Sequence, residues 1–362
     1  MGNNVIHVPL GNSSYSIAFT GLADLPSRCA SAHLRIGPCI VVTDPNVASI
    51  YLDQLRATLI SSGYAPITEI IIPSGEASKD AEFLQLIYDR ALTSRIDRQT
   101  PIIALGGGVI GDLAGYAAAT LLRGLPLVHI PTSLIAQVDS SIGGKTGINH
   151  SLGKNLIGAF HQPTLVVTDI EMLQSLPDLE YVSGLAEIVK HALIADADFV
   201  IDLSANWEKI ILRDRKYLDH MIMVAAKIKA DIVSQDEREA SLRAILNFGH
   251  TFAHAIEREA GYGKFTHGEA VALGMRAAAK VSYLVNPNLP YTDIDHLLNR
   301  LPIRNSIHHL DPMTLTQAMY FDKKVDDGKL RLILLREIGS AYVSTEISEE
   351  QIILGWKSIM SP

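Results

Sequence analysis

Cysteine is almost absent from this chain of 362 residues, which contains only Cys29 and Cys39. So few cysteines exclude a small secreted fold held together by disulfides, and they indicate a reducing compartment, so a cytoplasmic location is expected. Long apolar runs are also lacking. No stretch of about 18 residues is free of charge, and even the most apolar region contains Asp112 and Arg123. We therefore expect neither a membrane-spanning helix nor a membrane partner.

An excess of positive charge is lacking as well. The chain has 31 Lys and Arg against 39 Asp and Glu, a formal net charge of −8, which argues against a nucleic-acid partner. The first residues lack the basic and apolar segments of a signal peptide, so none is expected. With 48% apolar and 19% charged residues, the sequence predicts a folded globular protein long enough for two domains.

The most prominent motif in the sequence is a glycine-rich turn. An apolar strand predicted over 102–105 runs directly into Gly106-Gly107-Gly108, and a helical pattern covers 113–122. A strand, a glycine turn and a helix start together form a cradle for phosphate, because backbone N–H groups and the helix dipole both favour an anion. Glycine suits this turn because a Cβ would keep the backbone away from a pyrophosphate.

Two more glycine turns follow in series. A second apolar strand over 127–130 ends in Pro131-Thr132-Ser133, and Gly–Lys pairs then occur at 144–145 and 153–154. A lysine beside a glycine turn offers a point charge and a backbone cradle to a phosphate or carboxylate. One such turn would be typical of a solvated loop, whereas three in series predict a site for a polyanion.

The first half of the chain alternates between strands and helices. Strands are predicted over 39–43, 69–73, 102–105, 127–130 and 165–169, helices over 47–61 and 81–92, and a hairpin over 5–9 and 15–19. This order predicts a parallel α/β sheet that binds ligands at the carboxyl ends of its strands. Asp44 follows the first of these strands and could accept from ribose hydroxyls, but Asp-Pro-Asn is equally typical of a turn and helix cap.

The predicted secondary structure changes from strands and helices to helices after about residue 177. Helical periodicity predicts helices over 180–197, 198–213, 214–235, 240–260, 267–284 and 292–300. We therefore predict two domains, 1–177 and 178–362. Near the end, 330–335 and 341–343 are predicted to form a hairpin, and Ser348 with Gln351 to cap a final helix that runs to about Met360.

A group of metal-ligating side chains lies in the helical half. Glu187 is accompanied by His250 and His254, which are four residues apart and so lie on one helix face, and by His267. One carboxylate and two imidazoles with an open position are the pattern of a catalytic zinc site. Spacing leaves open whether His254 or His267 joins His250, and Glu269 is another candidate ligand.

The His-x-x-x-His spacing is also found in zinc proteases, but Thr251 occupies the position of their general-base glutamate, which excludes that class. Polar and basic side chains lie close in sequence to the metal candidates, among them Lys190, Lys229, Arg243 and Asn247. Each of them taken alone would be typical of a solvated helix face.

At residues 130–160 the sequence reads IPTSLIAQVDSSIGGKTGINHSLGKNLIGAF, which is nearly the signature of the 3-dehydroquinate synthases. The chain resembles this family of sugar phosphate cyclases from Asp44 to Val325, most densely over 105–195 and 236–275. The resemblance implies a Rossmann-like α/β NAD-binding domain with a parallel sheet and a mainly α-helical metal- and substrate-binding domain. It also implies an active site in the interdomain cleft and a homodimer.

The resemblance also implies roles for individual residues. Glu187, His250 and His267 would bind zinc or cobalt, which makes His254 a substrate-side residue. NAD would be held by Asp44, Asn46, Glu76, Lys79, Gly107, Gly108, Val109, Asp112, Thr132, Ser133, Lys154 and Ser175. Substrate would be held by Arg123, Asp139, Lys145, Asn155, Lys190, Lys229, Glu239, Arg243, Asn247, His254 and Lys324.

The implied reaction is a carbon–oxygen lyase reaction of the shikimate pathway. A phosphorylated keto acid, 3-deoxy-D-arabino-heptulosonate 7-phosphate, becomes 3-dehydroquinate and phosphate through transient oxidation by NAD, β-elimination, re-reduction, ring opening and an intramolecular aldol reaction. The alternatives are a sister cyclase that makes 2-epi-5-epi-valiolone or 2-deoxy-scyllo-inosose, a metal-dependent polyol dehydrogenase, and a non-enzymatic NAD-binding sensor. Lys229, Arg243, Asn247 and His254 match the dehydroquinate pattern, which favours the first interpretation.

Overall fold

The computed structural model describes residues 4–261, 263–320, 325–326 and 329–360. The chain divides into two compact units, the first formed by Met1–Leu176 and Lys229–Arg238, the second by Pro177–Ile228 and Glu239–Pro362. The short segment Lys229–Arg238 therefore belongs to the first unit, although the predicted boundary near 177 places it in the helical half. Within the described residues no helix is long and apolar enough to cross a membrane.

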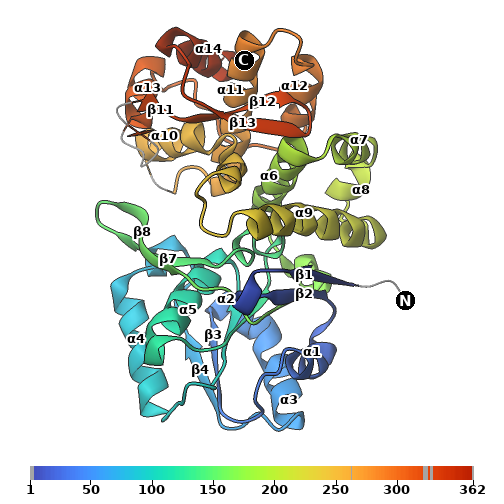
Figure 1. Cartoon of the computed structure of the whole chain (residues 1–362), viewed down its shortest axis with the longest axis vertical. Helices are drawn as coiled ribbons and strands as arrows, with labels where there is room; N and C mark the ends of the chain where they lie inside the picture. Colours follow the sequence, from blue (N-terminus) through green and yellow to red (C-terminus); the bar gives the residue numbers. More distant parts are fainter. Residues whose placement is uncertain (1–3, 262, 321–324, 327–328, 361–362) are drawn as a thin grey trace. The chain divides into compact units, whose positions relative to one another are not determined.

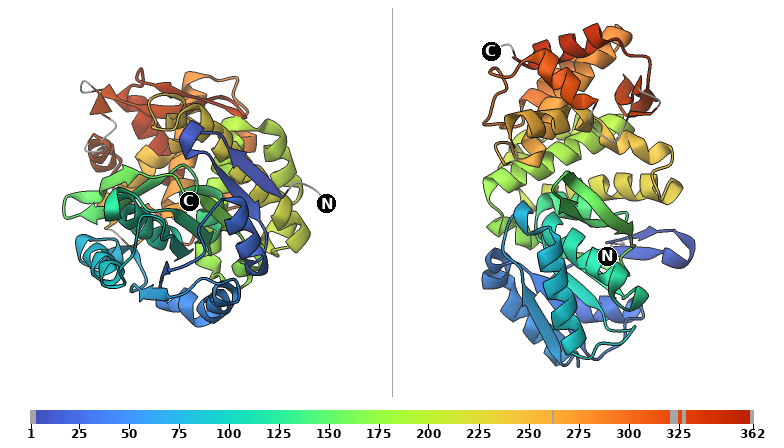
Figure 2. Two further views of the ribbon diagram at one scale, coloured as in Figure 1. Left: turned by 60° about the horizontal axis from the view of Figure 1, so that its bottom comes forward. Right: turned by 90° about the vertical axis from the view of Figure 1, so that its left-hand side faces the viewer.

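The first unit is built on a seven-stranded sheet (Figure 1). Its strands are β1 (Val5–Val8), β2 (Tyr15–Phe19), β3 (Cys39–Thr43), β4 (Ile67–Ile71), β5 (Ile102–Gly106), β6 (Leu127–Pro131) and β9 (Leu165–Thr168). They lie in the order β1-β2-β9-β6-β5-β3-β4, with β1 antiparallel to β2 and every other pair parallel. The predicted parallel sheet and the N-terminal hairpin are confirmed; Figure 2 shows this hairpin, in dark blue, at one edge of the unit.

Helices cover both faces of this sheet, because successive side chains of its strands point to opposite faces. The covering helices are α1 (Leu25–Ser31), α3 (Asp53–Ser61), α4 (Ala81–Thr93) and α5 (Gly108–Thr120), and a short α2 (Pro45–Val47) and a π-turn (Ala48–Leu52) precede α3. Ile40 and Ile102 pack into the core under α4 and α5. Their neighbours Val41 and Ile103 pack into the core under α1 and α3.

Two predictions for this unit are wrong in detail. The helix predicted to begin at 113 begins at Gly108, because the glycine turn itself forms the first turn of α5. The segment with the two Gly–Lys pairs, predicted as turns, is an antiparallel hairpin, β7 (Lys145–His150) and β8 (Gly153–Phe160). A Cβ on Gly147 would lie 2.4 Å from the carbonyl oxygen of Ile157, so the close approach of the two strands requires glycine. Glycine carries little β-propensity, which hides this hairpin from a sequence pattern.

The second unit is mainly helical. Its helices are α6 (Asp178–Ala195), α7 (Ala197–Ala205), α8 (Trp207–Ile211), the first part of α9 (Arg215–Gln235), α10 (His250–Ala260), α11 (His267–Val285), α12 (Tyr291–Asn299), α13 (Pro312–Met319) and α14 (Glu349–Met360). Short strands complete it: β10 (Val325–Asp326), β11 (Lys329–Leu330), β12 (Leu332–Glu337) and β13 (Ser340–Ser344). Helix α11 packs against α6, α10, α12 and α14, and is the centre of this core.

The predicted helical half and the β12–β13 hairpin are confirmed, with corrections to single elements. The predicted helix 240–260 is a 3-10 turn (Leu242–Asn247) followed by α10, because Gly249 has a φ of 81° and interrupts the helix. The predicted helix 198–213 is α7 and α8, and α13 was not predicted. The capping box is confirmed, since the Gln351 N–H donates to Ser348 Oγ at 3.2 Å and the Ser348 N–H to Gln351 Oε1 at 2.9 Å.

A buried histidine makes the stability of the first unit depend on pH. Burial, and to a smaller extent the neighbouring His161, lowers the pKa of His129 on β6 from 6.5 to about 4. The folded protein holds this ring neutral while the unfolded chain protonates it, so stability is lost as pH falls below 6.5 toward 4. Between pH 7 and pH 5, we expect the free energy of unfolding of His129→Gln to fall by about 2 kcal/mol less than that of the parent chain.

Urea unfolding at the two pH values measures this effect. His309→Gln, a change at an exposed histidine, should keep the pH dependence of the parent chain. Equal pH dependence in His129→Gln and the parent would contradict the prediction.

Candidate functional site

The loops that follow β3, β5 and β6 lie at one edge of the sheet, because parallel strands end on the same side. They carry Asp44, Gly107 and Thr132, and the Thr132 N–H donates to the Gly106 carbonyl at 3.0 Å. The chain runs from β3 outward to β4, returns to β5 beside β3, and continues in the other direction to β6. Such a reversal opens a crevice for ligands at the carboxyl ends of the strands. The predicted cofactor residues flank this reversal.

The glycine turn leaves little room for side chains. A Cβ on Gly107 would lie 3.3 Å from Ser133 Oγ, and one on Gly108 would lie 3.1 Å from Ser140 Oγ. Among the described residues, no side chain caps the start of α5. The first N–H groups of α5 therefore have no competing side-chain acceptor, and they carry the positive end of the helix dipole.

Asp44 caps a helix, which is one of the two roles that the sequence allowed. Its Oδ1 accepts from the N–H groups of Asn46 at 2.9 Å and Val47 at 3.3 Å, and from Ser74 Oγ at 2.9 Å. These bonds all use Oδ1 and fix the carboxylate at the end of β3. On the same side of the sheet, Tyr51 shares a 2.7 Å hydrogen bond with Ser175 Oγ.

A polar network joins the β7–β8 hairpin to the segment after β4. Lys79 is 4% exposed, and its Nζ donates to the Asp112 carboxylate and to Asn155 Oδ1. Asn149 donates to Glu76 Oε1 at 2.8 Å and accepts from the Asn155 N–H at 2.9 Å. Lys79 thus connects Asp112 with Asn155, and Asn149, which the sequence did not single out, connects Asn155 with Glu76.

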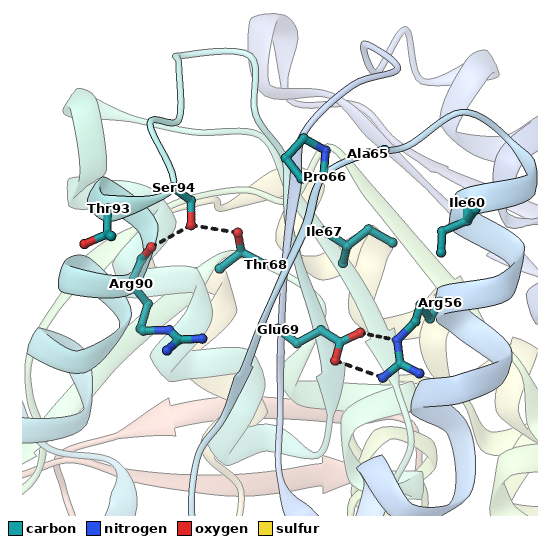
Figure 3. A pocket seen from close by; sticks show the side chains of 10 residues that line it. All are labelled: Arg56, Ile60, Ala65, Pro66, Ile67, Thr68, Glu69, Arg90, Thr93 and Ser94. Atoms are coloured by element: carbon teal, nitrogen blue, oxygen red, sulfur yellow. Dashed lines mark hydrogen bonds and ion pairs between the residues drawn. The ribbon is translucent and has the colours of Figure 1, made fainter.

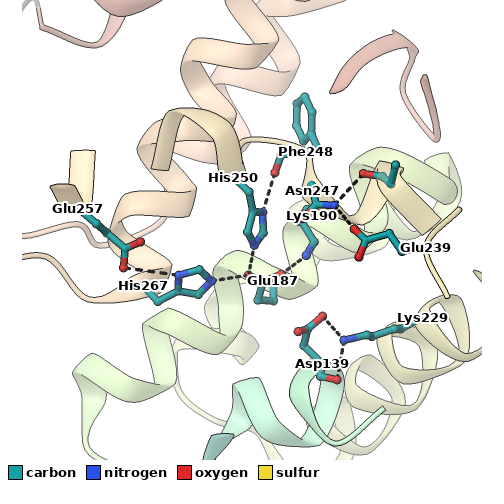
Figure 4. A network of polar contacts seen from close by, with 11 residues as sticks. Asp139, Glu187, Lys190, Lys229, Glu239, Asn247, Phe248, His250, Glu257 and His267 are labelled. Carbon is teal, nitrogen blue, oxygen red and sulfur yellow. Dashed lines mark hydrogen bonds and ion pairs between the residues drawn. The ribbon is translucent and has the colours of Figure 1, made fainter. Parts of the chain in front are cut away.

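Four other predicted residues of this unit, all basic, differ in how exposed they are. Lys229 is buried, and its Nζ lies 2.8 Å from Asp139 Oδ1 and donates to the Asp139 carbonyl at 2.6 Å (Figure 4). Lys145 is exposed at the start of β7, and Lys154 is half-buried on β8. Arg123 is exposed and has a left-handed backbone, with a φ of 68°.

In the second unit, three candidate metal ligands converge (Figure 4). Glu187 Oε1 lies 3.6 Å from Nε2 of His250 and 3.6 Å from Nε2 of His267. One ligand atom from each of the three lies within 4.8 Å of the other two. Glu187 comes from the middle of α6, whereas His250 and His267 are the first residues of α10 and α11.

The geometry bears on the alternatives that spacing left open. It places His267 with His250 and Glu187, while the His254 ring stands edge-on to the His250 ring with centroids 5.9 Å apart. Glu269 instead completes the N-cap of α11: its Oε2 accepts from the Thr266 N–H at 3.0 Å.

Both histidines have an acceptor near their second ring nitrogen. His250 Nδ1 lies 3.4 Å from the Phe248 carbonyl oxygen, and His267 Nδ1 lies 3.8 Å from Glu257 Oε1. An acceptor at Nδ1 favours the neutral tautomer whose Nε2 carries the lone pair that a metal needs. Glu257 was not predicted, although it lies seven residues after His250 and hence on the same helix face.

Charge is concentrated around Glu187. Burial lowers the pKa of His267, but the Glu187 and Glu257 carboxylates outweigh this and raise it to about 9. The ring is therefore protonated at neutral pH, and a cation that binds here must displace that proton. The second carboxylate oxygen of Glu187 pairs with the ammonium of Lys190, which is 2% exposed.

Close helix packing positions His267. A Cβ on the next residue, Gly268, would lie 2.2 Å from the Cα of Ser183, so the first turn of α11 rests directly on the α6 backbone. The capping carboxylate of Glu269 also accepts from the Arg304 N–H at 3.1 Å. Helix α11 is thus held against α6 at the point where the two helices present His267 and Glu187.

Other predicted residues lie near the start of α10. Asn247 Nδ2 donates to Glu239 Oε1 at 2.5 Å and to the Ala244 carbonyl at 3.2 Å. Arg243, on the same 3-10 turn, is only 1% exposed although it carries a charge. Lys324 lies outside the described residues.

A hollow of about 760 Å³ lies elsewhere, along the edge strand β4 of the first unit (Figure 3). Residues of α3, β4 and α4 line it, and none of the predicted site residues is among them. Its charged pair is structural in character, since the Arg56 guanidinium holds both carboxylate oxygens of Glu69 at 2.5 and 2.9 Å. The candidate site residues at the strand ends and in the histidine cluster therefore lie outside this hollow.

Known proteins match the chain over nearly its whole length. Family models described as 3-dehydroquinate synthase N-terminal and C-terminal match residues 69–183 and 184–325. The 3-dehydroquinate synthase of Salinibacter ruber is 49% identical, over 97% of this chain and 96% of the relative. The chloroplastic 3-dehydroquinate synthase of Arabidopsis thaliana is 46% identical, over 96% of this chain and 80% of the relative.

Solved structures of sugar phosphate cyclases have the same fold. The 2-epi-5-epi-valiolone synthase ValA of Streptomyces hygroscopicus, with NAD+ and Zn2+ bound, has a TM-score of 0.87 at 27% identity and covers 97% of this chain and 98% of its own. A 2-deoxy-scyllo-inosose synthase complexed with carbaglucose-6-phosphate, NAD+ and Co2+ has a TM-score of 0.86 at 27% identity, over 98% and 99%. An iron-containing alcohol dehydrogenase of Thermotoga maritima, at 16% identity and a TM-score of 0.67, shares the fold alone.

Proposed function

The chain belongs to the 3-dehydroquinate synthase family, and on that premise we propose that it converts 3-deoxy-D-arabino-heptulosonate 7-phosphate to 3-dehydroquinate and phosphate. The observation that carries this proposal is the convergence of Glu187, His250 and His267 in a chain that is 49% identical to a 3-dehydroquinate synthase. The reaction is redox-neutral overall, so NAD acts catalytically and is restored in each turnover.

The donor set fits a divalent metal. One carboxylate and two imidazoles leave a coordination position open, as catalytic zinc sites do, and the Nδ1 atoms of both histidines already face acceptors. Zinc and cobalt are the metals named for the two related cyclases. When bound, such a metal supplies a Lewis acid that polarises a substrate hydroxyl. Glu187, His250 and His267 would hold it.

The residues of the first unit fit NAD. The pyrophosphate would lie against Gly107 and Gly108 at the start of α5, and Asp44 is fixed at the neighbouring strand end for a ribose hydroxyl. When bound, NAD supplies a hydride acceptor that later returns the hydride. Other residues proposed to contact it are Asn46, Glu76, Lys79, Val109, Asp112, Thr132, Ser133, Lys154 and Ser175.

The substrate carries a phosphate and a carboxylate, so it requires cationic partners in a chain whose net charge is −8. Lys190, Lys229 and Arg243 are buried cations, and carboxylates at Glu187 and Asp139 hold the two lysines in place. Preplaced charges stabilise an anion without further reorganisation. His254 and Asn155 are proposed to orient substrate oxygens or move protons, and Arg123, Asp139, Lys145, Glu239, Asn247 and Lys324 complete the proposed set.

Phosphate release from a panel of substrates tests this function. We expect release from 3-deoxy-D-arabino-heptulosonate 7-phosphate in the presence of NAD and zinc, and none above background from sedoheptulose 7-phosphate or glucose 6-phosphate. Release from either of the latter two alone would assign the chain to a sister cyclase, the alternative that the two solved cyclases raise.

Glu257→Gln is expected to weaken zinc binding by about 10- to 100-fold, because Glu257 orients His267 through Nδ1 without contacting the metal. Competition with a chromophoric chelator measures the zinc affinity. Glu259→Gln, two residues further along the same helix, is the matched control and should bind zinc like the parent. Unchanged affinity in Glu257→Gln would show that this carboxylate does not orient the ligand.

A homodimer and a cytoplasmic location are proposed for the assembly. The first rests on the family resemblance, and the second agrees with two buried cysteines that are both free thiols. Light scattering should give about twice the chain mass of 39.4 kDa.

A further inference from the structure

The tip of the β7–β8 hairpin contains an irregularity at Asn149. The strands pair Ile148 with Ile157 and His150 with Gly153, so the register shifts between these pairs and Asn149 lies at the shift. Bulges of this kind bend a strand and redirect a side chain, and they are frequent beside functional sites.

The residue that this bulge redirects is Asn155, which has a φ of 55°. A left-handed backbone is unfavourable for a residue other than glycine, although asparagine tolerates it best, so it persists where surrounding contacts impose it. The contact here is the 2.9 Å hydrogen bond from the Asn155 N–H to Asn149 Oδ1. At the bulge, the Asn149 side chain thus takes over the role of a ladder carbonyl.

The nitrogen of the Asn149 side-chain amide, and the backbone of this residue, bind the segment 76–79. Its Nδ2 donates to Glu76 Oε1 at 2.8 Å, and its backbone N–H donates to the Lys79 carbonyl at 2.7 Å. Lys79 in turn donates from Nζ to Asn155 Oδ1, which closes a ring of contacts between the hairpin and the segment 76–79.

We propose that Asn149 is a positioning residue for the reaction: its amide holds Asn155 at a set position relative to Glu76 and Lys79. The inference rests on the proposed function, in which Asn155 contacts substrate while Glu76 and Lys79 contact NAD. Hydride transfer depends on the relative placement of substrate and cofactor, and a misplacement of about 1 Å can cost about a hundredfold in rate. One amide whose two ends bind the two segments supplies that placement.

Two substitutions separate the two ends of the amide. Asn149→Ala removes both bonds. Asn149→Asp keeps an oxygen for the Asn155 N–H but sets a second carboxylate against Glu76. We expect Asn149→Ala to raise hydrogen exchange in the peptide 145–160 and to lower kcat about tenfold, with the Kd of NAD also raised about tenfold. In Asn149→Asp, exchange should stay near the parent value while the Kd of NAD rises.

The matched control is His150→Ala, since His150 is exposed at the same hairpin tip and its Nδ1 accepts from the nearby Leu152 N–H at 3.2 Å. It should leave exchange, NAD binding and kcat unchanged. Parent-like exchange and kinetics in Asn149→Ala, or equal exchange in the alanine and aspartate variants, would overturn the proposal. If the parent chain releases no phosphate from the proposed substrate, the proposed function is wrong. The hydrogen exchange and the NAD affinity of the variants would still test the role of Asn149.

Discussion

Replacing Glu187 with glutamine is expected to strip the chain of metal and to lower kcat/KM by about a thousandfold or more. The carboxylate oxygen that faces both imidazoles would become part of a neutral amide, so the anionic ligand would be lost. Loss of the Lewis acid removes several kcal/mol of transition-state stabilisation, which corresponds to the thousandfold effect. The ammonium of Lys190, 2% exposed, would also lose this buried ion pair, so we expect a destabilisation of about 3 kcal/mol.

Metal content per chain and phosphate release, measured on the same preparation, test this expectation. Glu180→Gln is the matched control, because it makes the same change on the same helix α6 without altering the three ligands. The control should retain metal and turnover. A Glu187→Gln variant with full metal content and parent-like turnover would contradict the ligand assignment.

Gly268→Ala is expected to have the second largest effect, although it only adds a methyl group. That methyl would lie 2.2 Å from the Cα of Ser183 and 2.7 Å from its carbonyl oxygen, and backbone atoms cannot rotate away. Helix α11 must therefore move off α6, which displaces His267 relative to Glu187. We expect a loss of about 3 kcal/mol in stability and at least about a hundredfold in turnover.

Gly355→Ala separates misplacement from simple destabilisation. Its Cβ would lie 2.8 Å from the Val281 side chain, on the part of α11 remote in sequence from His267, so packing suffers without moving the ligand. We expect lower stability but normal metal content in this control. Equal metal content and turnover in Gly268→Ala and Gly355→Ala would show that contact between α6 and α11 does not position the cluster.

Strand and helix periodicity sufficed to predict the central sheet, because buried strands such as β3 and β5 are continuous apolar runs between polar turns. The β7–β8 hairpin was not predictable in this way. Its pairing depends on Gly147 and Gly158, where a Cβ would meet the opposite backbone at 2.4 and 2.1 Å, and glycine gives no strand signal. For the same reason the start of α5 lies within a segment that was interpreted as a turn.

The candidate site, too, was predictable from the sequence only in part. Residue chemistry identified Glu187 and the histidines, but spacing could not choose between His254 and His267, because the choice depends on how α10 and α11 pack against α6. Asn149 and Glu257 contact other candidate residues and belong to no motif of their own, so only the structure brings them to attention. The family resemblance supplied the ligand set that the geometry now groups together.

The most direct test of the account is the carbon balance of the reaction with NAD present at far below the substrate concentration. Purified protein with zinc would receive 3-deoxy-D-arabino-heptulosonate 7-phosphate, and NMR would follow the product while phosphate and NADH are measured in parallel. The account predicts one phosphate and one 3-dehydroquinate per substrate, many turnovers per NAD, and no accumulation of NADH. NADH that accumulates in step with substrate loss, without phosphate release, would contradict it and identify a simple dehydrogenase.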